Sequence, residues 1–236
     1  MSMPVPLAQS GGGFFRDRAA DSCVADNGIC PGWILDNLDR YTTPLAQHVF
    51  LTVTSVAAGF VIAFALAVLA HRRRWLVGPV TNVTGILYTL PSVAVFFLLL
   101  PITGRGSLTA IIALTAYTLL ILFRNVLAGL DGVPEDARDA GRGMGLSDRA
   151  LLWRVEVPLA LPAIMAGLRI ATTTTVGLAA LAFFAGAGGL GEPLEAQKAF
   201  KTNVLFAGGL CVALAVALDA AILLVQRRLT PWTRAA

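Results

Sequence analysis

The chain has 236 residues, of which 56% are hydrophobic and only 14% are charged, and its mean hydropathy is +0.74. Soluble domains carry about 25% charged residues, so this composition excludes a large soluble domain and indicates a membrane protein. The formal net charge of +4 comes from basic residues dispersed between apolar segments rather than from a continuous basic stripe, so nucleic-acid binding is not expected.

Residues 1–44 are predicted to form a tail outside the membrane. The beginning of the chain lacks the basic and apolar regions of a secretory signal peptide, so the first span is expected to stay in the mature protein. Apolar residues recur in the tail at spacings of 4, 3 and 4, at Ile34, Leu38, Tyr41 and Leu45. This pattern fits either an amphipathic helix on the outer membrane surface or a flexible tail with a few apolar residues.

Five apolar segments predict an all-α, multi-pass membrane protein with spans at about 49–70, 79–100, 107–123, 159–184 and 204–225. None of them shows the alternation of a membrane β-strand. Thr43 as N-cap and Pro44 at the first helical position predict the start of the first helix. Pro91 predicts a kink or a split in the second span, and Arg124-Asn125 predict the end of the third.

The distribution of basic residues predicts the orientation of the chain. Eleven of the 18 Lys and Arg residues fall in the connections 71–78, 124–158 and 226–236, whereas six fall on the opposite side and Arg169 lies in a span. Cytoplasmic connections carry more Lys and Arg than external ones. We therefore expect the N-terminus outside the cell and the C-terminus in the cytoplasm.

The cysteines and histidines show no metal-binding pattern. No second His or Cys stands at ligand spacing from His48 or His71, which flank the first span and are expected at the membrane interface. Cys23 and Cys30 lie in the external tail, where oxidation is possible, and the sequence leaves open a disulfide or two free thiols. Cys211 lies in the fifth span as a small apolar residue.

The connection 131–158 is polar and contains the signals of two short helices. Pro134 and two acidic residues begin the first helix, and Gly145 ends it. Ser147 caps the second helix, which Pro158 is expected to end. The arginines of this protruding segment, which we call the elbow, are Arg138, Arg142, Arg149 and Arg154. A solvated connection needs no such detail, so the elbow is predicted to dock a cytoplasmic partner.

The elbow resembles the cytoplasmic coupling loop of bacterial ABC-importer permeases, whose pattern is Glu-Ala-Ala, three residues, Gly, nine residues, Ile, any residue, Leu-Pro. In this chain the pattern reads Asp139-Ala140-Gly141, Gly145 and Val155-Glu156-Val157-Pro158. Glycine in a helix costs about 1 kcal/mol relative to alanine, so Gly141 predicts a weaker helix and softer docking. The resemblance implies that the ATPase-coupling residues are Asp139, Ala140, Gly141, Arg142, Met144, Gly145 and Pro158.

A wider resemblance, to the osmoprotectant branch of these permeases, covers residues 45–232. It rests on YTLPSVAVF (88–96), GRGMGL (141–146), VEVPLALPAIMAGLR (155–169), GAGGLG (186–191) and RRLTP (227–231). The resemblance implies a transmembrane permease domain of the type I importer fold in the bacterial cell membrane. It also implies a substrate such as glycine betaine, choline or carnitine, although methionine and sulfonate permeases share much of the scaffold. The implied partners are a cytoplasmic ATP-binding cassette ATPase dimer, a second permease subunit (a copy or a paralogue), an external binding protein and membrane lipid.

The chain is not expected to be an enzyme or to bind a cofactor. A phosphate-binding loop needs Gly-Lys-Ser/Thr, whereas Lys198 follows Gln197 and Lys201 follows Phe200. ATP hydrolysis is therefore assigned to a partner. GAGGLG matches the glycine spacing of a dinucleotide fingerprint, but it follows a membrane span rather than a strand. We expect it to form a tight external turn.

The fourth span contains small residues at every fourth position, which favours close helix packing: Ala163, Gly167, Ala171, Thr175 and Ala179. Arg169, Thr172 and Thr175 are candidates for the lining of a polar pathway. Asp219 lies in the fifth span, where an aspartate costs roughly 2.5–3.5 kcal/mol, so it is expected to face the interior and to pair with Arg169 or Arg124. Such charges also suit an ion-coupled secondary transporter, but that function leaves the elbow unexplained.

Overall fold

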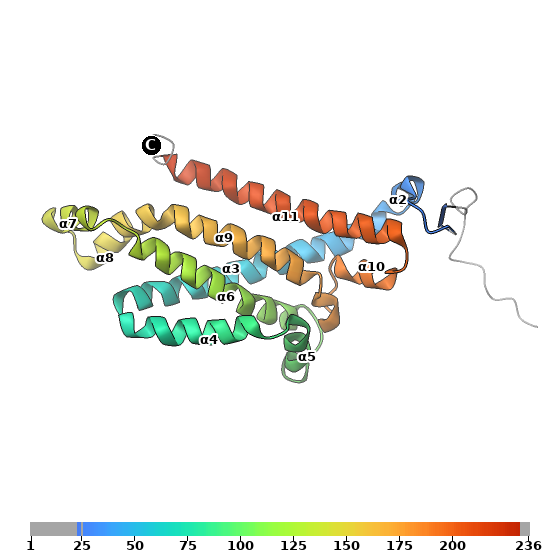
Figure 1. The fold of residues 1–236 in the computed structure, drawn as a ribbon, viewed down its shortest axis with the longest axis horizontal. Helices are drawn as coiled ribbons and strands as arrows, with labels where there is room; N and C mark the ends of the chain where they lie inside the picture. The colour runs from blue at the N-terminus through green and yellow to red at the C-terminus, as the bar shows by residue number, and fades with distance from the viewer. Residues whose placement is uncertain (1–22, 25, 232–236) are drawn as a thin grey trace, which may run out of the picture.

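The computed structural model describes residues 23–24 and 26–231, which form helices and connecting turns with no strand. The elements before the elbow are α2 (Pro31–Asp36), η1 (Leu38–Tyr41), α3 (Thr42–Arg72), η2 (Arg74–Leu76), α4 (Val77–Thr89), α5 (Ser92–Thr103) and α6 (Ser107–Asp131). The elements from the elbow onward are α7 (Glu135–Gly143), α8 (Asp148–Leu151), the π turn η3 (Leu152–Glu156), α9 (Val157–Ala179), η4 (Ala182–Ala185), α10 (Gly191–Ala196) and α11 (Lys201–Leu229). The long helices lie side by side along one axis (Figure 1).

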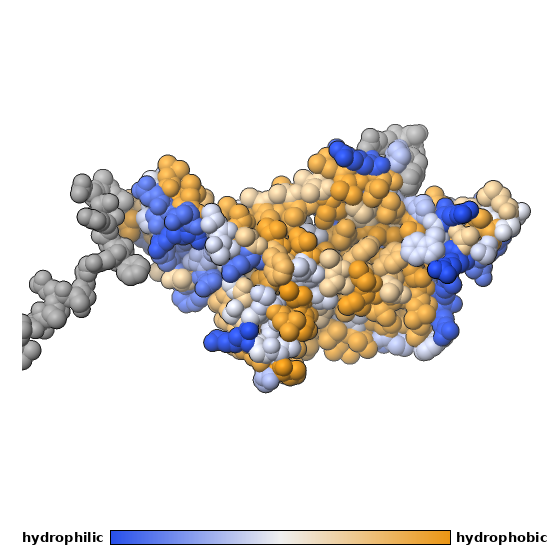
Figure 2. All heavy atoms as spheres, turned by 180° about the vertical axis from the view of Figure 1, so that it is seen from behind, coloured by the Kyte–Doolittle hydropathy of each residue, from blue (hydrophilic) through white to orange (hydrophobic). Residues whose placement is uncertain are grey.

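Four helical segments within the described residues are long and apolar enough to cross a membrane, and the pair formed by η2–α4 and α5 makes a fifth if it counts as one broken span. Figure 2 shows the matching surface, in which hydrophobic residues cover the middle of the molecule and hydrophilic residues gather toward the two ends of the long axis. The predicted all-α, multi-pass membrane fold is therefore confirmed.

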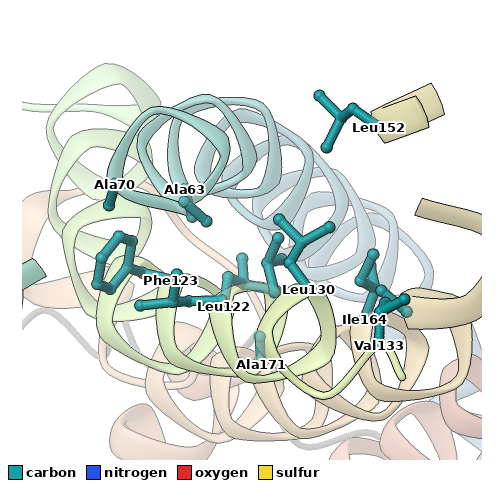
Figure 3. Packing of buried hydrophobic residues seen from close by; sticks show 13 residues of the cluster. Ala63, Ala70, Leu122, Phe123, Leu130, Val133, Leu152, Ile164 and Ala171 are labelled. Carbon is teal, nitrogen blue, oxygen red and sulfur yellow. The ribbon is translucent and has the colours of Figure 1, made fainter. Parts of the chain in front are cut away.

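The core lies where α3, α6 and α9 meet. Figure 3 shows Ala63 and Ala70 of α3 facing the larger side chains of α6, among them Leu122 and Phe123. Small side chains let helix backbones approach closely, which replaces the hydrophobic driving force that is missing between helices in lipid. Close approach increases the dispersion contacts of every neighbouring side chain.

The small residues of the fourth span take part in this packing. Gly167 lies so close to α6 that an added Cβ would stand 2.4 Å from the Asn125 Cβ. On the other side of the same contact, a Cβ on Gly129 of α6 would stand 3.0 Å from the Ala163 Cβ. Ala171 and Ala179 are fully buried. The predicted packing stripe is therefore confirmed, and it joins α9 to α6.

Three predicted helix boundaries are wrong. The first helix begins at Thr42 without a side-chain cap, so Thr43 and Pro44 lie inside its first turn. The third apolar helix runs on to the end of α6, because Arg and Asn are tolerated in a helix and Asn125 donates to the Ile121 carbonyl at 2.8 Å. The second elbow helix does not end at Pro158 but continues through the π turn into α9. Proline is tolerated here because it directly follows the π turn, in which the Val157 amide bonds to the Leu152 carbonyl and the hydrogen-bond pattern departs from that of a regular α-helix.

The predicted break at Pro91 is confirmed. Leu90 is extended, as expected for a residue before proline, and α5 bends by 98° from the preceding helix. The Tyr117 hydroxyl of α6 donates to the Leu90 carbonyl at 2.6 Å. This hydrogen bond satisfies a carbonyl group that the break removes from the helical ladder.

The described part of the tail is not the continuous amphipathic helix that the apolar spacing suggests. It forms α2 and η1, and Asn37, which closes α2, donates from its side chain to the Trp33 carbonyl at 2.8 Å. Tyr41 is buried against Phe206 of α11 and so packs on protein rather than on lipid. Residues 1–22 of the predicted tail, and residue 232 at the end of the predicted permease domain, lie outside the described residues.

Candidate functional site

The elbow forms at one end of the molecule, where α7 and α8 protrude (Figure 1). Helix α7 ends in a glycine turn, as predicted, because Gly145 has φ +80°, a conformation that favours glycine. The amide of Gly145 donates to the Arg142 carbonyl at 2.8 Å, and the amide of Leu146 donates to the Gly141 carbonyl at 3.2 Å. The predicted cap of α8 is also confirmed, since the Ser147 hydroxyl accepts from the Ala150 amide at 3.4 Å.

The coupling-loop residues divide into an exposed face and a packed side. Exposed residues of the elbow include Asp139, Ala140, Arg142, Met144 and Gly145. Arg142 and Asp139 pair at 3.1 Å, and the Met144 side chain is 73% exposed. This combination of charges and a flexible apolar side chain suits the docking of another protein. Pro158, in contrast, is a half-buried residue of α9.

Gly141 is the packed residue of this set. An added Cβ would stand 2.5 Å from Cδ1 of the buried Leu151, the end of a flexible side chain that would have to move. The glycine therefore lets α7 lie close to α8. The sequence pattern predicts only its effect on helix propensity, because this packing partner comes from the second elbow helix.

A buried carboxylate, Glu156, lies beneath the elbow. Its Oε1 accepts from Arg138 Nε at 2.9 Å, and its Oε2 lies 3.6 Å from His71 Nε2 at the end of α3. Arg138 Nη2 also donates to the carbonyl of Leu130 at 2.7 Å, in the last turn of α6. Helix ends leave carbonyl groups without helical partners, and a cation there is favourable.

A second carboxylate extends this network at the end of α6. Asp131 lies 2.7 Å from His71 Nδ1 and 2.6 Å from Arg74 Nη1. His71 therefore contacts Asp131 with one ring nitrogen and Glu156 with the other. We call His71, Arg74, Asp131, Arg138 and Glu156 the hinge network. Sequence reasoning missed it, although an isolated acidic residue between Val155 and Val157 at the membrane boundary was a signal for Glu156.

His48, which was expected at the membrane interface, is fully buried inside the protein, because its ring packs between α3, α9 and the segment before α10. Its Nε2 lies 2.9 Å from the Val176 carbonyl of α9, and its Nδ1 accepts from the Leu190 amide at 3.2 Å. The imidazole thus joins α3 to α9 and to the GAGGLG segment, which contains Leu190.

The GAGGLG segment forms the predicted tight turn, at the end of the molecule opposite the elbow (Figure 1). Gly186, Gly188 and Gly189 all have positive φ. A Cβ on Gly188 would stand 2.1 Å from Gln47 Oε1, and one on Gly191 would stand 1.6 Å from the Ala180 carbonyl oxygen. The described residues before it are helical, so the turn is not a dinucleotide fingerprint.

The intramembrane charges form a bidentate pair that joins α9 to α11. Arg169 Nε and Nη2 each donate to Asp219 at 2.7 Å, so the predicted partner is Arg169 rather than Arg124. The two side chains stay 34% and 29% exposed in the single chain. Thr172 and Thr175 are buried, and each hydroxyl bonds to a carbonyl of its own helix. A pathway role for these four residues stays a prediction.

Comparisons with known proteins identify the family. Residues 55–234 match the family described as binding-protein-dependent transport system inner membrane component. The chain is 37% identical over 206 residues to the osmoprotectant import permease protein OsmW of Salmonella typhimurium (strain LT2), an alignment that covers 84% of this chain and 96% of the relative. It is 33% identical over 187 residues to the glycine betaine/carnitine/choline transport system permease protein OpuCB of Bacillus subtilis (strain 168), covering 78% and 86% of the two chains.

A solved structure shows the same fold. A chain of the inward-facing MetNI methionine ABC transporter superimposes with a TM-score of 0.70 at 24% identity, covering 84% of this chain and 98% of that chain. At this identity the likeness concerns the fold alone, that of an ABC importer permease. The match of the family over most of the chain and the relatives above 30% identity show that this chain belongs to the inner membrane components of binding-protein-dependent transport systems.

Proposed function

We propose that this chain is the membrane-spanning permease subunit of an ATP-driven importer and forms the pathway for a small quaternary-amine osmolyte. The observation that carries the proposal is the elbow, whose exposed face contains Asp139, Ala140 and Gly145 in the family spacing, together with Arg142 and Met144. The names of the two relatives, an osmoprotectant permease and a glycine betaine/carnitine/choline permease, support the substrate class. No observation on this chain favours methionine, a sulfonate or an ion-coupled mechanism.

The proposed assembly contains a cytoplasmic ATPase dimer, a second permease subunit and an external binding protein. The ATPase docks on the elbow, and the binding protein delivers the osmolyte at the opposite end. A permease of this design binds no cofactor, because its partner subunits hydrolyse ATP. Asp139 and Arg142 give the docking face one charge of each sign, so partner charges of both signs are accommodated.

The test uses the permease reconstituted in liposomes with an ABC ATPase and a binding protein from the same organism. Uptake of radiolabelled glycine betaine, choline and carnitine is measured together with capture of the ATPase by the tagged permease. Arg142→Glu reverses a charge on the docking face, and Gly145→Val strains a position with positive φ. We expect each variant to insert normally but to lose ATPase capture and uptake by about tenfold or more, equivalent to about 1.4 kcal/mol.

Gly104→Val is the matched control, since Gly104 also has positive φ but lies in the turn between α5 and α6, away from the elbow. It is expected to keep ATPase capture. Normal capture and uptake in both elbow variants would contradict docking at the elbow. Uptake of methionine in place of the three osmolytes would contradict the substrate class alone.

A further inference from the structure

One buried side chain, that of Glu156, links the elbow to two membrane helices. The side chain is only 10% exposed and contacts Arg138 of α7 and His71 of α3. Arg138, 15% exposed, in turn bonds to the last turn of α6 through the Leu130 carbonyl. Glu156 therefore joins α7 and α3 to the π turn that leads into α9, and Arg138 extends this link to α6.

The local backbone explains why Glu156 points inward. It ends the π turn, directly before α9, and it is buried together with Leu152 while Trp153 and Arg154 of the same turn are exposed. Pro158, two residues later, has no N–H to complete a regular α-helical turn. Single π turns inside helices frequently mark functional sites.

Open space lies beside this link. A cavity of about 400 Å³ separates the end of α3 from α7 and α8, and it is lined by His71, Arg72, Arg142, Asp148, Leu151, Leu152 and Glu156. The Glu156–His71 pair stands at the wall of this cavity. The elbow therefore has room to move relative to α3 once the pair is lost.

Charge adds a reason for rigidity. Taking a carboxylate out of water costs free energy unless cations and hydrogen bonds compensate it. The intact hinge network therefore resists separation of the elbow from the membrane helices. Removing either Arg138 or Glu156 leaves the other group buried without its opposite charge and hydrogen bond, whereas removing both leaves a neutral site. The network is thus held in one arrangement by its own electrostatics.

We infer that Glu156 is a positioning residue that ties the elbow to the ends of α3 and α6, so that a displacement of the elbow by the ATPase moves these helices with it. The inference rests on the proposed docking of an ATPase, but its structural part concerns this chain alone. Glu156 stands at the unspecified position of the coupling-loop pattern. Its role follows from its contacts rather than from that pattern.

Hydrogen–deuterium exchange of the full-length permease in nanodiscs tests the link directly. In the free protein, Glu156→Gln is expected to raise the exchange of α7 amides by about fivefold or more relative to the wild type. Addition of the ABC ATPase used in the uptake test should slow exchange in the elbow and at the ends of α3 and α6 in the wild type. In Glu156→Gln the slowing should be confined to the elbow, with ATPase capture retained.

The double variant Arg138→Gln/Glu156→Gln separates positioning from simple loss of stability. Because it removes both partners, it is expected to recover thermal stability relative to Glu156→Gln, yet still to leave α3 and α6 unresponsive to the ATPase. It also keeps the test decisive if Glu156→Gln fails to fold. The control is Lys198→Gln/Glu195→Gln, which removes an exposed pair of 2.6 Å near the opposite end and should change none of these readings.

An α3 and α6 response equal to the wild type in the double variant would overturn the inference, as would unchanged exchange of α7 in the free Glu156→Gln protein. Loss of ATPase capture in proportion to thermal stability would also overturn it, because that result indicates a purely structural residue. Absence of ATPase binding to the wild type would contradict the proposed function instead, and the exchange of α7 in the free protein would still decide whether Glu156 holds the elbow.

Discussion

The effect of a single residue in this chain depends on how closely its neighbours approach. Gly167 of α9 and Gly177 of the same helix have equal helix propensity, yet their surroundings differ. A Cβ added to Gly167 would stand 2.4 Å from the Asn125 Cβ. The Asn125 Cβ is bonded to the backbone of α6 and so has little freedom to move. In contrast, nothing lies within 4 Å of a Cβ added to Gly177. The packing partner, not the residue type, decides what a substitution does.

Gly167→Ala is therefore expected to destabilise the protein. Overpacking of a close contact costs about 1–3 kcal/mol, against a gain in helix propensity of about 1 kcal/mol. We expect the melting temperature in detergent, followed by tryptophan fluorescence, to fall by several degrees.

Gly177→Ala is the matched control and should leave the melting temperature unchanged or raise it slightly, since it gains helix propensity without a clash. Equal melting temperatures for the two variants would contradict the close approach of α6 and α9.

At the scale of the element, α11 is the helix least embedded in the bundle, with none of its most apolar window buried in the single chain. Among the contacts that hold it are the Arg169–Asp219 pair in the membrane and a loop of the tail at its start. The disulfide between Cys23 and Cys30 closes that loop. Thr202 Oγ1 accepts from the Cys30 amide at 2.9 Å and donates to the Gly28 carbonyl at 2.8 Å.

Asn27 of this loop acts as the cap that α11 lacks. Its Oδ1 accepts from the Lys201 amide at 2.9 Å, and its Nδ2 donates to the Ala199 carbonyl at 2.9 Å. The first amides of a helix have no helical partner, so this distant side chain satisfies one of them. Asn27 has φ +52°, a conformation that asparagine tolerates better than most residues.

Asn27→Ala is expected to loosen the start of α11. Loss of a helix cap costs about 0.5–2 kcal/mol, so hydrogen exchange at residues 201–204 should accelerate by roughly 2- to 30-fold. Asp26→Ala changes the exposed neighbour and serves as the control. If both variants exchange at the wild-type rate, the tail loop does not cap α11.

At the scale of the whole molecule, the arrangement of charges supports one orientation. The elbow, the basic end of α3 and the C-terminal end of α11 lie at one end of the long axis, and the turn formed by GAGGLG lies at the other (Figure 1). Arg72 ends α3, Arg73 and Arg74 follow it, and Arg227 and Arg228 lie in the last turn of α11. By the positive-inside rule this end is proposed to face the cytoplasm.

Reporter fusions test that orientation. Green fluorescent protein fused after residue 236 is expected to fluoresce, and alkaline phosphatase fused there should be inactive, because the first folds in the cytoplasm and the second requires oxidation outside it. Alkaline phosphatase inserted between Gly104 and Gly106 should be active. The reverse pattern would exclude a cytoplasmic elbow, and with it the docking of the ATPase.

The sequence by itself predicted elements whose signals are local. Pro91 broke the second span, Gly145 ended α7 and Ser147 capped α8, because proline, glycine and serine act on the backbone within a few residues. The sequence wrongly predicted a helix end at Pro158. Proline is tolerated there because it directly follows a π turn at the start of α9. The spacing of the elbow also identified the family, since that spacing is a property of the chain alone.

Hydropathy and helix signals thus predicted an all-α membrane protein, and the spacing of the elbow resembled the coupling loop of ABC-importer permeases. Only the tertiary structure decided which polar groups meet. His48 contacts a carbonyl 128 residues away, and Asn27 caps a helix 174 residues away. Glu156 joins the elbow to α3 through His71. Such contacts depend on how the helices pack against one another, and a polar side chain in a sequence carries no sign of the distant group that will compensate its burial.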